Sequence, residues 1–181
     1  MNEKFIVGII VSNHFGVLNR VAGLYAKRGY NIDSLAVGET ENPAYSRMTI
    51  VSTGDEYMKN QVLRQLEKLH DVKMVALLEK DRSVSIEHML IKLKVKDAEK
   101  AAISNLINDY GGKVMDFGGS FITAEITGSS EKIERFIDAA RNTGILEVCR
   151  SGLISMVQGT DNVYGIQLAS LGESDGSVDS R

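Results

Sequence analysis

Apolar residues near the start of the chain change from a strand pattern to a helix pattern at a glycine. Both faces of residues 5–11 carry apolar side chains, as in a strand that is buried on both sides. After the loop 12–16, apolar residues recur at helical spacing, and Gly29 stands where a helix C-terminal cap is expected. The helical positions are Val17, Leu18, Val21, Leu24 and Tyr25. The sequence therefore predicts a strand, a tight loop and a helix that begins at Gly16.

The rest of the first half predicts three more strands and one more helix. The expected elements are strands at 32–37, 46–52 and 72–78, with a helix after the capping residues 53–55. The turn at 41–44 separates the first two of these strands. The order over residues 1–79 is therefore βαββαβ.

The same order begins again after the charged break at 79–83. The expected elements are a strand at 87–95, a helix from Asp97 to Gly111, strands at 113–117 and 121–126, a helix after Ser129 and a strand at 146–157. A βαββαβ chain packs two helices on one face of a four-stranded antiparallel sheet, so the fold class is α+β. We expect two tandem ferredoxin-like domains at 1–79 and 84–158, followed by a flexible tail at 159–181, where the apolar pattern decays.

Composition and charge narrow the class of protein. The 181 residues include 21 Lys and Arg against 24 Asp and Glu, a net charge of −3 that gives no basic field for nucleic acid or anionic lipid. A single cysteine rules out an intrachain disulfide, and no apolar run has the length of a membrane span or a secretory signal. We therefore expect a cytoplasmic protein with no nucleic-acid or membrane partner. Cys149, in a predicted strand, is expected to be a small buried hydrophobe.

The ferredoxin-like fold hosts several functions, which the residues at its usual sites can separate. RNA recognition needs aromatic side chains on a central strand, and 47–51 has none. Metal transfer needs cysteines in the loop 12–16, which has none. An acyl-phosphate hydrolase needs a cation in that loop, whereas Arg20 lies one helical turn further on. The three histidines are far apart in sequence and no catalytic group is assembled. Amino-acid sensing remains.

The loop before the first helix is the best candidate for a binding site. The amides of Gly16, Val17 and Leu18 have no helical acceptor, and the helix dipole favours a carboxylate or phosphate there. The alternative is that Gly16 only permits the turn, and the turn alone does not decide. His14 is either a hydrogen-bond donor in this site or a solvated loop residue, and the second interpretation is preferred.

Three stretches of the first half resemble the ACT domain of acetolactate synthase small subunits. They are NHFGVLNRVAGL at 13–24, RGYNIDSL at 28–35 and SRMTI at 46–50. The resemblance spans about residues 4–158 and includes the family's C-terminal domain, through the stretches 65–69, 89–92 and 147–152. The chain departs from the family at His14 and Phe15, where an acidic or small residue is usual, and at His88, where arginine is common.

The resemblance implies a regulatory subunit without catalytic activity of its own. Such a subunit binds a separate large catalytic subunit, a transferase expected to use thiamine diphosphate, magnesium and FAD, and raises its activity. It also confers feedback inhibition by valine in valine, leucine and isoleucine biosynthesis. The small subunit is expected to need no cofactor or metal and to form a homodimer through its ACT domains. The alternatives are an ACT-type sensor acting on another enzyme or a transcription factor, and a structural dimerisation module.

The implied effector site lies between the strand-helix loop of one protomer and the second strand of the other. The valine carboxylate is expected to meet the amides of Gly16, Val17 and Leu18. The remaining contacts are assigned to Asn13 and to Asn31 of the other protomer for the polar head, to Ile32 and Val37 for the isopropyl pocket, and to His14 at the loop. Spacing alone leaves turn chemistry as an equal alternative for both asparagines.

Overall fold

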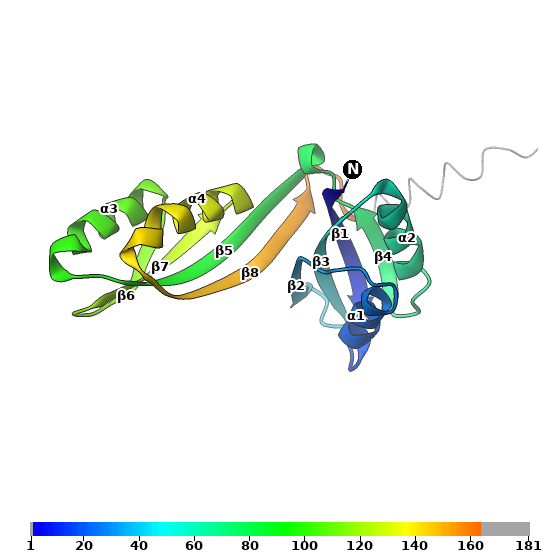
Figure 1. The fold of residues 1–181 in the computed structure, drawn as a ribbon. Coiled ribbons are helices and arrows are strands. Elements are labelled where there is room, and N and C mark those ends of the chain that lie inside the picture. Colours follow the sequence, from blue (N-terminus) through cyan, green and yellow to red (C-terminus); the bar gives the residue numbers. More distant parts are fainter. Residues whose placement is uncertain (1, 164–181) are drawn as a thin grey trace, which may run out of the picture. The chain divides into compact units, whose positions relative to one another are not determined.

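Two four-stranded sheets, each with two α-helices on one face, make up the computed structural model of this chain (Figure 1). The structure describes residues 2–163. Its described residues fall into two units: the first contains 2–84 and 155–163, and the second contains 85–154. The α+β class and the tandem ferredoxin-like architecture are confirmed. The domain boundaries at 79, 84 and 158 remain predictions.

The first unit has the predicted βαββαβ order. Its elements are β1 (Glu3–Ser12), α1 (Val17–Lys27), β2 (Ser34–Glu39), β3 (Tyr45–Gly54), α2 (Glu56–Leu66) and β4 (Val72–Leu77), followed by a short 3-10 helix (Lys80–Arg82). The strands are ordered β2-β3-β1-β4, with every neighbouring pair antiparallel. Strands β2 and β4 are therefore the edges of this sheet.

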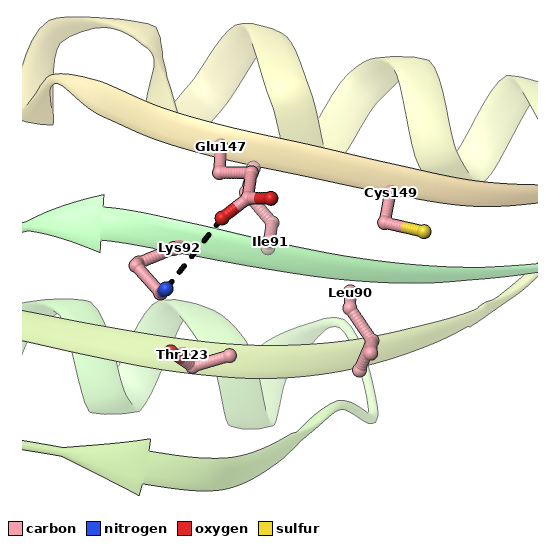
Figure 2. A pocket seen from close by; sticks show the side chains of 6 residues that line it. All are labelled: Leu90, Ile91, Lys92, Thr123, Glu147 and Cys149. Atoms are coloured by element: carbon pink, nitrogen blue, oxygen red, sulfur yellow. Dashed lines mark ion pairs between the residues drawn. The ribbon is translucent and has the colours of Figure 1, made fainter.

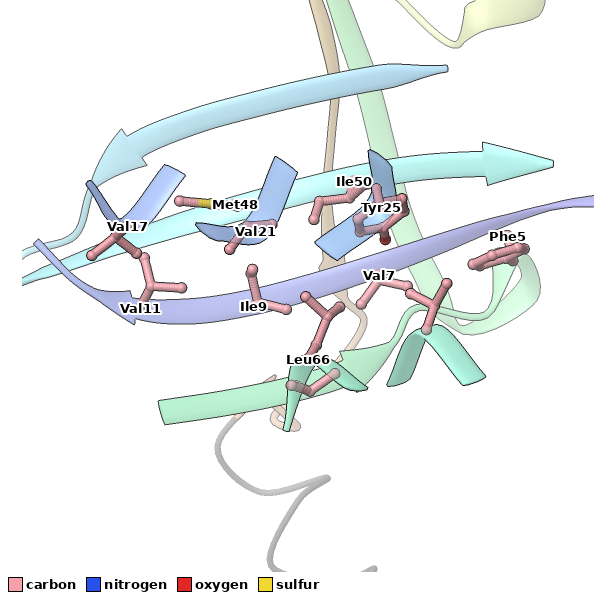
Figure 3. Packing of buried hydrophobic residues seen from close by; sticks show 12 residues of the cluster. Phe5, Val7, Ile9, Val11, Val17, Val21, Tyr25, Met48, Ile50 and Leu66 are labelled. Carbon is pink, nitrogen blue, oxygen red and sulfur yellow. The ribbon is translucent and has the colours of Figure 1, made fainter. Parts of the chain in front are cut away.

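Strand β1 is buried on both faces, as its sequence predicts. On one face, its side chains pack against α1 and α2 in the main core of the unit (Figure 3). This core includes Phe5, Val7, Ile9, Val11, Val17, Val21, Tyr25, Met48, Ile50, Val62 and Leu66. On the other face, Ile10 packs with Ala76, Leu78 and Val163. The sheet therefore has an apolar layer on each side.

Residues 155–163 supply the second of these layers. Val163 is only 2% exposed and belongs to the small cluster around Ile10. The Arg47 guanidinium donates from Nη2 to the carbonyl of Ser155 at 2.7 Å. The prediction assigned 159–163 to a flexible tail, whereas Val163 packs on the sheet. The remainder of that predicted tail, 164–181, lies outside the described residues.

The second unit repeats the order. Its elements are β5 (Ser83–Lys94), a short 3-10 helix (Asp97–Glu99), α3 (Lys100–Asp109), β6 (Lys113–Phe117), β7 (Phe121–Gly128), α4 (Ser130–Ala140), a second short 3-10 helix (Arg141–Thr143) and β8 (Ile145–Val157). The strand order is β6-β7-β5-β8. Strand β5 begins at Ser83, four residues before the expected start, and takes the end of the charged break into the sheet.

A buried ion pair fastens β8 in the second unit. The Glu87 side chain on β5 is 5% exposed and accepts from Arg150 Nη2 at 2.8 Å. Arg150 also donates from Nη1 to Glu134 Oε1 of α4 at 2.6 Å, and Ser130 donates to Glu87 Oε2 at 3.2 Å. The hydrogen bonds to Glu87 raise the pKa of Arg150, so its charge is fixed. One arginine therefore ties β8 to both β5 and α4.

Candidate functional site

The loop before α1 presents an uncapped helix N-terminus. Gly16 is the N-cap, with a left-handed φ of +87°, and α1 begins at Val17, one residue later than predicted. No side chain caps α1, whereas Asp55 accepts from Met58 N at the start of α2. A Cβ built on Gly16 would have nothing within 4 Å. The space beside Gly16 is therefore open, and no side chain competes with an anion for the start of α1.

Asn13 links this loop to the edge strand β2. Its side-chain amide donates to Glu39 Oε1 and to the carbonyl of Pro43, both at 2.9 Å. Its backbone amide donates to the carbonyl of Ala44 at 2.8 Å. Asn13 therefore serves the loop structure in a single chain, and its role toward an effector stays a prediction.

Asn31 lies at the opposite end of α1. Its side-chain amide donates to Asp33 Oδ1 at 2.7 Å, and Asp33 in turn accepts from Thr53. A helix of 11 residues is about 16 Å long, so one chain does not bring Asn31 and Asn13 together. A shared effector site would need a second protomer, as the resemblance implies.

The two residues assigned to the apolar part of the site differ in exposure. Ile32 is half-buried and packs against the main core of the first unit. Val37 lies on the edge strand β2 and is 47% exposed. Near the start of α1, Leu18 is 43% and Phe15 is 97% exposed. The loop and the sheet edge therefore both offer apolar surface that one protomer leaves uncovered.

His14 is hydrogen-bonded within the chain while its side chain stays about half exposed, so the choice between an effector contact and a solvated loop residue remains a prediction. Its Nε2 lies 3.0 Å from Asp71 Oδ1, and its Nδ1 lies 3.1 Å from the carbonyl oxygen of Phe15. Arg20 pairs with the other oxygen of the Asp71 carboxylate. The side chain of Asp71 is only 6% exposed, whereas those of His14 and Arg20 are each about half exposed.

The charge of Asp71 is maintained by its two partners. Burial would raise the pKa of this carboxyl, but the hydrogen bonds and charges of Arg20 and His14 outweigh it and hold that pKa below its ordinary value. Asp71 is not among the residues predicted from the sequence. It lies 57 residues from His14, and no local motif connects the two. The only signal is an acidic residue directly before the apolar run of β4.

A shallow hollow of about 160 Å³ lies on the helix-free face of the second unit (Figure 2). Its lining is formed by Leu90, Ile91, Lys92, Thr123, Glu147 and Cys149. Lys92 and Glu147 form an ion pair across it at 3.5 Å. Cys149 is exposed, so the prediction of a buried thiol is wrong: it lies on an edge strand and faces this hollow. None of the predicted effector residues lies here.

The described part of the chain has neither a group of metal-ligating side chains nor a membrane-spanning helix. Within residues 2–163, no three His, Cys, Asp or Glu side chains are grouped so that they could hold a metal ion. None of the helices in that range combines the length and the apolar character needed to cross a bilayer.

Comparison with known families assigns both units. Residues 7–74 match the model of the AHAS small subunit-like ACT domain, so the first unit is an ACT domain. Residues 86–159 match the model described as the small subunit of acetolactate synthase. The chain belongs to the family of acetolactate synthase small subunits.

Individual relatives match along almost their whole length. The probable acetolactate synthase small subunit of Methanothermobacter thermautotrophicus is 39% identical over 159 residues, which cover 87% of this chain and 95% of the relative. The acetolactate synthase isozyme 3 small subunit of Escherichia coli is 36% identical over 155 residues, 85% and 95% of the two chains. A crystal structure of the small subunit from Thermotoga maritima shares 34% identity, with a TM-score of 0.82 over 88% of this chain and 99% of that one.

Proposed function

We propose that this chain activates the large catalytic subunit of acetolactate synthase and makes that enzyme sensitive to valine. The observation that carries the proposal is the match of both units to the small-subunit family. Condensation of pyruvate then takes place on the large subunit, which is expected to hold thiamine diphosphate, magnesium and FAD. The small chain contributes a binding event and a change in the activity of its partner.

The uncapped start of α1 supports a site for the carboxylate of a free amino acid. The amides of Gly16, Val17 and Leu18 supply donors and a favourable dipole, and Gly16 leaves room beside the backbone. The side-chain oxygen of Asn13 can accept from an ammonium group, while its two amide hydrogens are donated to Glu39 and Pro43. These features fit the binding of an α-amino acid, because they supply hydrogen bonds and no catalytic group.

A homodimer completes this site. The edge strand β2 of one protomer and the loop 13–16 of the other would meet if two ACT domains joined side by side. Asn31 and Ile32 of one protomer would then hold the head and side chain of an effector carried by the loop of the other. Val37 on β2, half-exposed in one chain, would be covered in such a dimer.

Selectivity among branched-chain amino acids is expected to be modest. One methylene in an apolar pocket discriminates by about 1–3 kcal/mol, so leucine and isoleucine should bind more weakly than valine without being rejected. A calorimetric titration with valine, leucine, isoleucine, serine and phenylalanine separates this proposal from a sensor for another amino acid. A structural dimerisation module would bind none of the five.

Substitution of Gly16 tests the ligand position. Gly16→Asp adds a side chain at the closest approach to the ligand and a negative charge that repels its carboxylate. We expect valine inhibition of the reconstituted holoenzyme to disappear while activation of the large subunit persists. A holoenzyme that stays fully valine-sensitive would show that the carboxylate binds elsewhere.

Gly159→Asp is a matched control in the first unit, outside the candidate site. Gly159 also has a positive φ, +75°, and a Cβ there would also have nothing within 4 Å. The control therefore imposes a similar backbone strain and the same change of charge without touching the loop 13–16 or the residues assigned to the other protomer. Its holoenzyme should keep valine inhibition.

A further inference from the structure

We propose that Asp71 is a positioning residue of the effector site, whose buried carboxylate holds the loop 13–16 in the conformation that binds the ligand. The inference rests on the proposed function, because it concerns the same site. Asp71 does not touch the ligand in this arrangement. It acts through His14 and Arg20.

Asp71 contacts the chain on both sides of Gly16. Its carboxylate accepts from His14 within the loop and from Arg20, one turn into α1. Its backbone carbonyl accepts from the amide of Ser12, at the end of β1, at 2.8 Å. Three points that flank the candidate anion site are thus fastened to one residue at the start of β4.

Asn13 fixes the start of the loop to residues 39–44, but residues 14–16 have few contacts besides those to Asp71. Gly16 has no side chain, and the side chain of Phe15 is 97% exposed. The Val17 amide lies 3.5 Å from the His14 carbonyl oxygen, which is at the limit of a hydrogen bond. A loop that had to be ordered by its ligand would bind more weakly, because ordering costs conformational entropy. The Asp71 contacts remove part of that cost in advance.

The same contacts set the charge near the site. The Nη1 group of Arg20 is paired with Asp71, so part of this guanidinium is no longer available to an anion. His14 occupies the other carboxylate oxygen. The charge of Arg20 offsets the negative charge of Asp71, which would otherwise repel a carboxylate ligand.

The test compares valine binding and hydrogen exchange in the full-length chain. Asp71→Asn is expected to weaken calorimetric valine affinity about fivefold or more. Amide exchange should become faster at Asn13 and Arg20, whose amides are hydrogen-bonded around the loop, but stay unchanged in the ladder between β1 and β3. Arg20→Gln removes the exposed partner and leaves the core intact, so it should give the same two changes even if Asp71→Asn folds poorly. The double variant should be no worse than Asp71→Asn alone, because that variant has already lost the ion pair with Arg20.

Glu56→Gln is the matched control, since Glu56 is also ion-paired in the first unit but lies on α2. It should change neither readout. If the wild type binds valine and both Asp71→Asn and Arg20→Gln bind it with the same affinity, the positioning role is wrong. The proposed function would still stand. Tighter binding in Asp71→Asn would also overturn it, since a released Arg20 would then be the better ligand. A wild-type chain that binds no valine would overturn the proposed function and this inference with it.

Discussion

Gly16 and Asp71 contribute to the candidate effector site in different ways, and only the first could be found from the sequence. The position of Gly16 is predicted by the strand pattern before it and the helix pattern after it. Its φ of +87° explains why glycine is suited to the position. The resulting turn leaves the start of α1 without a side-chain cap. Asp71 fixes the same turn from a distant part of the chain.

Asn31→Ala tests the effector role at the scale of one side chain. In the proposed dimer, loss of the amide leaves polar groups of the ligand unpaired, at a cost of about 1–3 kcal/mol. Valine affinity should therefore fall roughly tenfold or more, as measured by calorimetry. Asn60→Ala removes a comparable exposed side-chain hydrogen bond on α2 and should have no effect. Equal affinities for Asn31→Ala and the wild type would reject the assignment.

The lowered pKa of Asp71 predicts how stability depends on pH. A carboxyl with a depressed folded-state pKa stabilises the protein above its unfolded-state value of about 3.9 and loses that contribution as pH falls through the folded value. The wild type should therefore exceed Asp71→Asn in free energy of unfolding at neutral pH, with the difference shrinking below about pH 4. Urea denaturation at a series of pH values measures it. A difference that is the same at neutral and strongly acidic pH would contradict the ion-pair account.

Sequence separation explains what was predicted at this scale and what was not. The loop residues adjoin in sequence, so one motif contains Asn13, His14 and Gly16. The partner of His14 lies 57 residues away, where a single acidic residue has many equivalent interpretations. The hydrogen bond between His14 and Asp71 could therefore be recognised only once β4 was placed beside β1.

At the scale of elements, the periodicity of apolar residues predicted the order of helices and strands well and their first and last residues less well. Every predicted helix and strand exists, but β5 starts at Ser83 and a 3-10 turn precedes α3. The exposure of Cys149 follows from the position of β8 at the edge of its sheet. Strand order within a sheet is a long-range property that alternation along one strand does not encode.

Substitution of Arg150 tests how much its ion pairs stabilise the second unit. Arg150→Ala leaves the Glu87 carboxylate buried without its charged partner, so we expect a loss of about 2–4 kcal/mol, less than for a fully buried pair because Arg150 is one-third exposed. Arg141→Ala removes an exposed pair with Asp138 in the same unit and should cost under about 0.5 kcal/mol. Chemical denaturation compares the two. Similar small losses would show that the Glu87 pair does not stabilise the unit.

Substitution of Val163 tests how much the segment 155–163 stabilises the first unit. Val163→Ala removes two buried methyl groups from the cluster around Ile10 and should cost about 1–2 kcal/mol. Val84→Ala changes a side chain that is 56% exposed and should be close to neutral. Equal stabilities of the two variants would mean that the segment covers the sheet without stabilising it.

At the scale of the whole molecule, two units of one topology present different surfaces. The helix-free face of the first sheet is covered by residues 155–163, whereas that of the second carries an open hollow lined by Lys92 and Glu147. The fold of each unit followed from its own sequence. The proposed effector site is shared between protomers, so no single chain displays it completely, and the resemblance to acetolactate synthase small subunits supplied that part of the prediction.

Acetolactate formation by the purified large subunit tests the central claim most directly. The rate is measured with and without this chain, over a series of valine concentrations, with Gly16→Asp alongside the wild type. The account predicts a higher rate when the chain is added, suppression of that rate by valine in the wild type, and no suppression in Gly16→Asp. A rate that is unchanged by the chain, or raised equally at every valine concentration, would contradict it.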